Sequence, residues 1–246
     1  MQIHVFQTAE EMGRDAAHFM ADRLNTAIAA QGSARLLLST GASQFETVAA
    51  LAQQEVDWSR VSMFHLDEYV GLPERHAASF RKYLKERFVS QVALGEAVFV
   101  SGECDVAANI ARLTNRLAEA PIDVAAIGIG ENGHIAFNDP PADFETEESY
   151  IVVNLDERCK RQQVGEGWFA SVEEVPNQAV SMTVRQMLRA RMIVSVVPHL
   201  VKADAVQKTL AQPVNNLVPA TILKTHPDWH LYLDAASAAS FVRLPD

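Results

Sequence analysis

The sequence predicts an α/β protein: a single Rossmann-like domain over residues 1–246, with a mostly parallel sheet and helices on both faces. Two patterns support this. Short apolar runs alternate with amphipathic segments along the chain, as in strands joined by crossover helices. The run 122–130 is almost continuously apolar, as expected for a parallel strand that is buried on both faces. A chain of 246 residues is long enough to bury such a sheet.

The first elements show how the pattern is interpreted. Residues 3–6 form an apolar strand, and Thr8 with Glu11 is a capping-box start for a helix. Apolar residues of that helix, such as Met12 and Ala16, recur at three-and-four spacing. The same reasoning predicts further strands at residues 35–39, 61–66, 98–100, 122–130, 192–197 and 229–233. It predicts further helices at residues 44–53, 79–92, 106–117 and 201–210.

The least regular stretch runs from residue 140 to about 176. It holds several acidic residues and then Gly-Glu-Gly-Trp at 165–168. An irregular excursion of this length inside a compact domain is usually a functional lid or a binding loop. We therefore expect residues 140–176 to act in part as a lid.

Composition limits the classes of partner. The chain has 21 Lys and Arg against 31 Asp and Glu, a net charge of −10, which opposes binding to nucleic acid. No apolar stretch reaches the roughly 18 residues of a membrane span, and the N-terminus does not resemble a signal peptide. Cys104 and Cys159 lie far apart, so we expect reduced thiols. These features predict a cytoplasmic protein that binds neither nucleic acid nor a membrane.

The segment 39–43, Ser-Thr-Gly-Ala-Ser, lies between a predicted strand and a predicted helix. Small residues let backbone N–H groups approach an anion, and the start of the helix adds a favourable dipole. Many strand-to-helix turns contain Gly and Ser only because the turn requires them. On its own, this segment fits a phosphate site and an ordinary turn equally well.

Asp67 and Glu68 follow the predicted strand 61–66, where open α/β sheets bind ligands. One of these carboxylates could be a general base. Adjacent strand residues point to opposite faces, so both are not expected to face one substrate. The alternative is that they begin a solvated loop or pair with Arg75 or Arg81 as structural ions.

The segment 128–139 carries three glycines, then His134, and then Asp139. A histidine can move protons near neutral pH, and a nearby carboxylate can hold its imidazole in one tautomer. The alternative is a loop histidine that is satisfied by backbone groups. The spacing is not that of a dinucleotide site, which excludes a nicotinamide cofactor here. Metal remains a minor alternative, and no Gly-x-Ser-x-Gly elbow supports a serine hydrolase.

Three motifs occur in order: Ser-Thr-Gly-Ala-Ser at 39–43, Leu-Asp-Glu-Tyr-Val-Gly-Leu-Pro at 66–73, and Gly-Ile-Gly-Glu-Asn-Gly-His-Ile-Ala-Phe-Asn-Asp-Pro at 128–140, with His-Pro at 226–227. In this order, over nearly the whole chain, they resemble the glucosamine-6-phosphate deaminase/isomerase family, which is similar to the 6-phosphogluconolactonases. The second and third motifs are the deaminase forms. Lactonases typically have Asp-Glu-Arg and Gly-His-Thr-Ala-Ser-Leu-Phe-Pro.

The resemblance implies an enzyme that needs no metal and no cofactor and converts a sugar phosphate, glucosamine 6-phosphate, to fructose 6-phosphate and ammonia. Asp67 would take the C2 proton and return it to C1. His134 would open the ring by moving a proton from the anomeric hydroxyl to the ring oxygen, and Asp139 would orient His134. A carboxylate can shuttle a proton between neighbouring carbons while a polarised carbonyl holds the enolate charge.

By the same resemblance, the turn 40–43 and Lys202 would hold the phosphate, with Lys202 at the start of its helix. The predicted substrate-binding residues are Thr40, Gly41, Ala42, Ser43, Gly133, Lys202 and Arg161. The predicted catalytic residues are Asp67, Asn132, His134 and Asp139.

Four positions depart from the usual family pattern. Asn132 stands where many members have an aspartate, which implies a shorter or different proton relay. Asp139 replaces a glutamate, and reaching His134 could then require a water or a shifted loop. The usual phosphate arginine falls near Gln162 or Gln163, with Arg161 as a substitute, and His65 replaces a frequent asparagine.

Three other functions stay open on the sequence: an isomerase for another hexose phosphate such as galactosamine 6-phosphate, a lactonase, and a non-catalytic sugar-phosphate sensor. The chain ends at Asp246, without the C-terminal extension of the allosteric hexameric members. We therefore expect a monomer or small homo-oligomer, without activation by an N-acetylated sugar phosphate.

Overall fold

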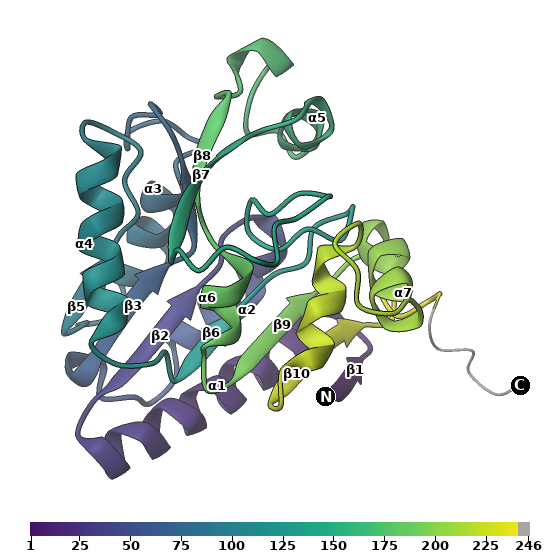
Figure 1. Ribbon diagram of the computed structural model, residues 1–246. Helices are drawn as coiled ribbons and strands as arrows, with labels where there is room; N and C mark the ends of the chain where they lie inside the picture. Colours follow the sequence, from purple (N-terminus) through teal and green to yellow (C-terminus); the bar gives the residue numbers. More distant parts are fainter. Residues whose placement is uncertain (241–246) are drawn as a thin grey trace, which may run out of the picture.

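A seven-stranded, entirely parallel sheet forms the centre of the molecule (Figure 1). The computed structural model describes residues 1–240, so the expectation based on Asp246 concerns a position outside them. In spatial order, the strands are β1 (Gln2–Phe6), β10 (Trp229–Asp234), β9 (Ile193–Val197), β6 (Val124–Ala126), β2 (Ala34–Leu38), β3 (Val61–His65) and β5 (Glu96–Val98). The predicted α/β class with a mostly parallel sheet is confirmed.

Helices cover both faces of this sheet, as predicted. The α-helices are α1 (Ala9–Gln31), α2 (Phe45–Ala52), α3 (Phe80–Leu84), α4 (Val106–Ala118), α5 (Glu157–Gly165), α6 (Val184–Leu188) and α7 (Ala203–Ala211). The 3₁₀ turns are η1 (Ala42–Gln44), η2 (Trp58–Arg60), η4 (Val172–Glu174), η5 (Leu200–Lys202) and η6 (Pro219–Thr225), and η3 (Lys85–Val89) is π-helical. Alternate residues of β2 face opposite layers. Leu36 packs in the core with Met20 of α1, and Leu37 packs in the core with Leu113 of α4.

A second, antiparallel sheet was not predicted. It consists of β4 (Asp67–Tyr69), β8 (Gln178–Met182) and β7 (Tyr150–Asn154), and it rises above the carboxyl ends of the parallel strands (Figure 1). The prediction that residues 140–176 are irregular was therefore wrong in part, because they contain β7 and α5. β7 is stabilised by β8, which lies more than twenty residues farther along the chain. Its burial alternates along the strand, as in a sheet with one wet face.

Three predicted elements have different bounds. The strand expected to reach Gly130 ends at Ala126, because the chain turns there into a loop closed by the Gly130 N–H donating to the His134 carbonyl at 2.9 Å. The helix predicted over 79–92 is α3 followed by η3, whose wide turn is closed by Ser90 N–H donating to the Lys85 carbonyl at 2.9 Å. The extended segment predicted at 98–100 is β5, two residues earlier.

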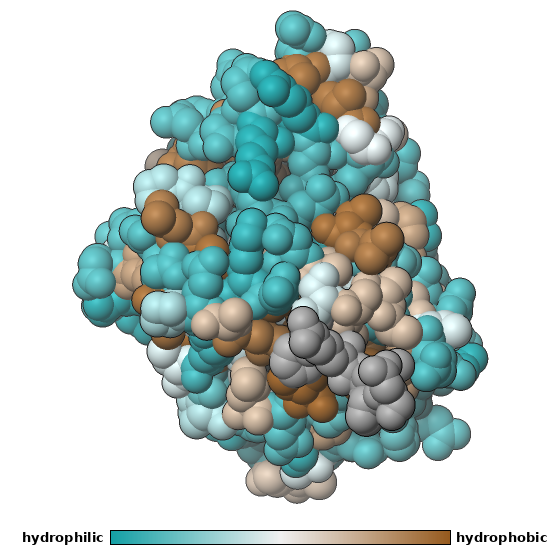
Figure 2. All heavy atoms as spheres, turned by 90° about the vertical axis from the view of Figure 1, so that its right-hand side faces the viewer, coloured by the Kyte–Doolittle hydropathy of each residue, from teal (hydrophilic) through white to brown (hydrophobic). Residues whose placement is uncertain are grey.

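The surface beside α7 is mostly hydrophilic, with small separate apolar patches (Figure 2). The exposed apolar side chains of residues 1–240 include Leu200, Val201 and Leu217. Scattered groups of this kind are normal on a protein surface. Within residues 1–240, no helix has the length and hydrophobicity that crossing a membrane requires.

The carboxylate of Glu68 holds β4 in place. It is completely buried and accepts hydrogen bonds from the Ser79 hydroxyl at 2.8 Å, from the Arg81 N–H at 2.9 Å and Nε at 3.2 Å, and from the backbone N–H groups of Tyr69 and Phe80. These donors satisfy a charge that would otherwise be costly to bury. They tie β4 to the start of α3.

Removing the charge of Arg81 tests this anchor. In Arg81→Met, the Glu68 carboxylate keeps its burial and loses its counter-ion, which should reduce the free energy of unfolding by about 3–5 kcal/mol. The control is Arg60→Met, which removes an exposed ion pair with Asp57. This variant should change the free energy of unfolding by less than about 1 kcal/mol. Urea denaturation measures both, and equal effects would contradict the role given to Glu68.

Candidate active site

A pocket of about 900 Å³ opens to solvent at the carboxyl ends of four parallel strands. Its walls come from residues 39–43 after β2, Leu66 and Asp67 after β3, residues 128–131 after β6, and the segment 199–202 after β9. This is where open α/β sheets bind their ligands, because the loops that follow neighbouring parallel strands meet at one edge. The fold therefore brings the three sequence motifs to one cavity.

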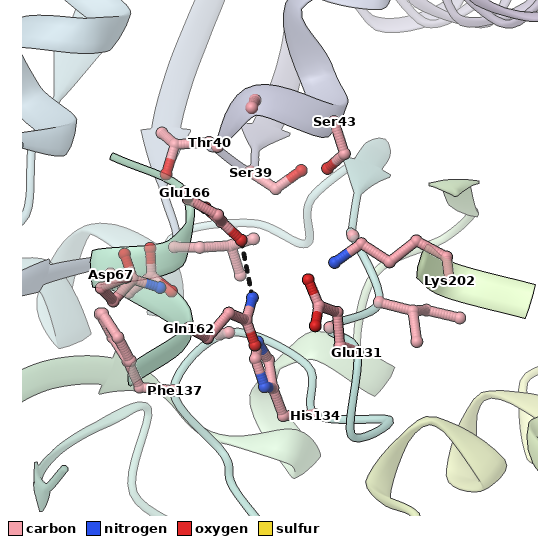
Figure 3. Close-up of a pocket in the computed structure, with 18 of the residues that line it drawn as sticks. Ser39, Thr40, Ser43, Asp67, Glu131, His134, Phe137, Gln162, Glu166 and Lys202 are labelled. Atoms are coloured by element: carbon pink, nitrogen blue, oxygen red, sulfur yellow. Dashed lines mark hydrogen bonds between the residues drawn. The ribbon is translucent and has the colours of Figure 1, made fainter. Parts of the chain in front are cut away.

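The structure places most predicted site residues in or directly behind this pocket. Those that line it are Thr40, Gly41, Ala42, Ser43, Asp67, His134 and Lys202 (Figure 3). Asp139 lies behind His134, and Gly133 lies at the turn beside it. Asn132 and Arg161 line a hollow that adjoins the pocket.

The turn at 40–43, predicted as a phosphate site, lines the pocket. Gly41 has φ 101°, a region that favours glycine, and the turn leads into η1 and α2. Buried Gln44 fixes the turn by donating from Nε2 to the Val196 carbonyl at 3.1 Å and to Ser43 Oγ at 3.0 Å. Ser39 Oγ is buried at the pocket wall and has no hydrogen-bond partner within residues 1–240. It is therefore available to a ligand.

Lys202 ends η5 and caps α7, and its side chain extends toward the centre of the pocket (Figure 3). The residue is only 6% exposed. Burial lowers the pKa of its ammonium group, while the carboxylates of Glu166 and Glu131 oppose that shift. A buried cation in such a cavity is well placed to bind an anion.

Asp67 lines the pocket, and Glu68 next to it points into the protein. This confirms that the two carboxylates do not face one ligand. Glu68 pairs with Arg81, as one alternative predicted. The other alternative, a solvated loop, was wrong for both carboxylates, because both are buried. Burial, and then the charge of Glu68, raise the pKa of Asp67 to about 8. Asp67 can therefore exchange a proton near neutral pH.

His134 projects into the pocket with its ring against Gly130, where a Cβ atom would lie 2.2 Å from the imidazole. Its Nδ1 lies 3.2 Å from Asp139 Oδ1, close enough for an ion pair but without the alignment of a hydrogen bond. Asn132 donates from Nδ2 to the same Asp139 oxygen at 3.0 Å, and its Oδ1 accepts from the His134 N–H. The shorter Asp139 thus reaches the imidazole directly, without a bridging water.

Burial disfavours ionisation of Asp139, but its contacts with His134, Asn132 and Cys159 outweigh burial and lower its pKa to about 2. An ionised Asp139 favours a proton on the Nδ1 that faces it. The second ring nitrogen, Nε2, is then the one left for a ligand.

Comparison with known proteins identifies the family. Residues 7–231 match the model of the glucosamine-6-phosphate isomerases/6-phosphogluconolactonase. The chain belongs to this family. It is 34% identical over 207 residues to a glucosamine-6-phosphate deaminase of Streptococcus pneumoniae, covering 84% of this chain and 87% of that protein. It is 32% identical to one of Streptococcus suis, covering 98% and 100%.

Solved structures agree. A monomeric glucosamine-6-phosphate deaminase superposes with a TM-score of 0.88 at 27% identity, covering 98% of this chain and all of that one. The 6-phosphogluconolactonase of Trypanosoma brucei has a TM-score of 0.80 at 15% identity, covering 98% of both chains. The second match supports the fold alone. The predicted resemblance to the glucosamine-6-phosphate deaminase/isomerase family is confirmed.

The resemblance placed the expected phosphate arginine near Gln162 or Gln163, and both of these residues lie in α5. Gln163 lines the pocket there, and its Oε1 accepts a hydrogen bond from the Tyr69 hydroxyl at 2.6 Å. Arg161, predicted as a substitute, lies outside the pocket, where its exposed guanidinium pairs with Glu157 at 3.3 Å. This position does not favour Arg161 as a phosphate ligand, because the side chain points to solvent.

The polar residues that line the pocket but were not among the predicted site residues include Ser39, Glu131, Glu166 and His199. Glu131 lies inside the recognised motif but had no assigned role. His199 follows the predicted strand 192–197, and its φ of 78° is unusual for a residue with a side chain. Such strained residues cluster at functional sites. Glu166 lies within the Gly-Glu-Gly-Trp stretch of the predicted lid, but α5, which it follows, was not predicted.

A metal site was a minor alternative on the sequence. Within residues 1–240, no group of three or more His, Cys, Asp and Glu side chains is arranged to hold a metal ion. Both cysteines are unpaired. The expectation that the protein needs neither a metal nor a cofactor stays a prediction.

His65 lies behind the pocket wall and does not line it. It is completely buried between the edges of Phe80 and Phe99, and neither ring nitrogen has a partner within residues 1–240. Burial, and then the charge of Arg81, lower its pKa to about 3. The folded protein therefore keeps this histidine neutral.

This burial should make the fold sensitive to acid. Below pH 6.5 the unfolded chain protonates His65 and the folded chain does not, so the free energy of unfolding falls as pH drops toward 3, by about 1.4 kcal/mol per pH unit. His65→Leu removes this contribution. Urea denaturation between pH 6 and 4 should show that the free energy of unfolding of His65→Leu falls less steeply than that of the wild type.

The control is His18→Leu, whose side chain is 69% exposed and should leave the pH dependence unchanged. If wild type and His65→Leu lost stability with the same slope, His65 would not be a neutral buried group.

Proposed function

We propose that this protein is an amino-sugar-phosphate deaminase/isomerase that converts glucosamine 6-phosphate to fructose 6-phosphate and ammonia. The main support is that Asp67, His134, Lys202 and the turn 40–43 line one pocket. Relatives that are 32–34% identical over most of the chain are named glucosamine-6-phosphate deaminases. Both lines point to the same substrate.

In this proposal the phosphate binds between the turn 40–43 and Lys202. The Ser39 and Ser43 hydroxyls and the buried ammonium group of Lys202 line the same pocket as the turn, whose backbone N–H groups would also bind the phosphate. Charge-assisted hydrogen bonds of this kind hold phosphates strongly. Binding there leaves the other end of the sugar near Asp67 and His134.

His134 opens the sugar ring. Its Nε2 takes the proton of the anomeric hydroxyl and delivers a proton to the ring oxygen. Asp139, which is ionised at neutral pH, stabilises the imidazolium that forms in between. Asn132 positions both groups, through its amide on Asp139 and its carbonyl on the His134 N–H. We propose that this short chain replaces the longer relay of other family members.

Asp67 carries out the isomerisation in the open-chain sugar. It removes the proton from C2, which gives an enolamine, and returns a proton to C1 of the same molecule. The resulting ketose imine at C2 is hydrolysed to the ketone and ammonia. A carboxylate with a raised pKa suits both halves of this transfer, because it can hold the proton between them.

We propose that α5 and its flanking loops, within 140–176, act as a lid. Gln162, Gln163 and Glu166 come from this segment and line the pocket. Residues 1–246 would form one enzyme domain, either a monomer or a small homo-oligomer. A cytoplasmic location fits a substrate that carries a charged phosphate.

Ammonia release tests the proposal. Wild-type protein should release ammonia from glucosamine 6-phosphate, and Asp67→Asn should release it about 10³-fold more slowly, because its amide cannot accept the C2 proton. His134→Gln should also be slow. A substrate deuterated at C2 should lose the label from C2, to C1 of the product or to solvent, in the wild type only, a readout that a lactonase would not give.

Asp22→Asn in α1 is the matched control, because Asp22 is exposed and pairs only with nearby His18 within residues 1–240. It should keep wild-type activity. If wild type released no more ammonia than Asp67→Asn, the deaminase proposal would be wrong.

The pKa of Asp67 predicts the pH profile. Because the base must be deprotonated, kcat/KM should rise about tenfold per unit between pH 6 and 7 and level off above about 8. Initial rates at subsaturating substrate measure this. Binding of glucitol 6-phosphate over the same range separates the effect of phosphate ionisation, and a flat profile from 6 to 8 would contradict the role of Asp67.

A further inference from the structure

The pocket has more acids than an anion site needs. Its ionisable side chains are Asp67, Glu131, Glu166, His134, His199 and Lys202. Lys202 is thus the single permanent cation in this set, against three carboxyl groups. A ligand with only negative charge would meet repulsion from two or three of them. The balance favours a ligand that brings a positive charge of its own as well as an anionic group.

Glu166 is the acid that is held over the middle of the pocket. It follows the last turn of α5, and its carboxylate lies between Asp67 and Lys202 (Figure 3). Oε1 accepts a hydrogen bond from Gln162 Nε2 at 2.8 Å, and Oε2 accepts one from Trp168 Nε1 at 3.1 Å. Glu166 is an exposed residue, and these neutral donors orient its carboxylate without cancelling its charge.

The charge of Glu166 influences two neighbouring ionisable groups. Glu166 opposes the lowering of the Lys202 pKa by burial, and it adds to the rise in the pKa of Tyr69, which burial dominates. Tyr69 lies two residues after Asp67 on β4. Glu166 therefore influences Lys202, on the side that holds the anion, and Tyr69 behind the pocket.

We propose that Glu166 is a specificity-determining residue that binds the 2-ammonium group of the substrate and so selects amino-sugar phosphates over their hydroxyl counterparts. This inference rests on the proposed function. Its basis is the fixed carboxylate over the pocket centre together with the surplus of acids around a single lysine.

The other two acids are less suited to this role. Asp67 has a pKa of about 8 and is mostly protonated in the free protein at neutral pH, so it offers little charge to an ammonium group. Glu131 lies between Lys202 and His134 (Figure 3), so it is farther in this view from Asp67, the residue proposed to act at C2, than Glu166 is. Of these two carboxylates, Glu166 is the one on the Asp67 side of the pocket in Figure 3, where the amine at C2 would lie.

Two ligands that cannot be turned over test this inference. These are 2-amino-2-deoxyglucitol 6-phosphate and glucitol 6-phosphate, which differ only in the group at C2. Calorimetry should show that the wild type binds the amine more tightly. In Glu166→Gln the preference should fall about tenfold, through weaker binding of the amine, because an amide cannot form an ion pair with it.

Two matched variants control for charge. Glu131→Gln removes a carboxylate from the same pocket, and Glu157→Gln removes an exposed one from the same helix. Both should keep the wild-type preference. If Glu166→Gln keeps that preference or tightens both ligands equally, or if Glu131→Gln alone loses it, the inference is wrong.

The same measurement separates this inference from the proposed function. If the wild type binds neither hexitol phosphate, the proposed substrate class is wrong, and the inference is wrong with it. If the wild type binds both and Glu166→Gln keeps the preference, only the inference is wrong.

Discussion

The position of the site depends on one buried carboxylate. Glu68 receives donors from β4 and from the start of α3, and its ion pair with Arg81 lies almost completely out of solvent. Because the carboxylate cannot leave its donors without a large penalty, the direction of β4 is set. Adjacent strand residues point to opposite sides, so Asp67 must then face the pocket. A structural ion pair thus orients the proposed catalytic base.

The loops at the carboxyl ends of the parallel strands supply other residues that line the pocket. The loop after β6 brings His134 so close to Gly130 that only a residue without a side chain fits there. Ala136 and His199, at φ 50° and 78°, also line the pocket. A packed sheet can hold residues in such unfavourable backbone conformations, since many contacts determine where each loop begins and ends.

The pocket sets two carboxyl groups to opposite protonation states. Burial and the charge of Glu68 raise the pKa of Asp67 to about 8. Contacts with His134 and Asn132 lower the pKa of Asp139 to about 2. Environments that move the pKa values of two carboxyl groups in opposite directions are typical of acid–base sites. Asp67, whose pKa is raised, can exchange a proton with a sugar carbon in the proposed reaction. Asp139, whose pKa is lowered, stays charged beside the imidazole of His134.

The sequence by itself determined the parallel sheet and the positions of its motifs. Apolar periodicity is a local property, and the ends of parallel strands must meet at one edge, so Asp67 and His134 could be expected to converge. The opposite orientations of Asp67 and Glu68 followed from the same local geometry.

Only the tertiary structure decided what covers the pocket. In the second sheet β4 pairs with β8, which pairs in turn with β7. Both strands lie more than eighty residues after β4 along the chain, and no local period reports such a pairing. α5 depends on that sheet for its position, so the presence of Glu166 in the pocket and the absence of Arg161 could not be read from spacing. Long-range contacts placed these side chains, and a local pattern does not record them.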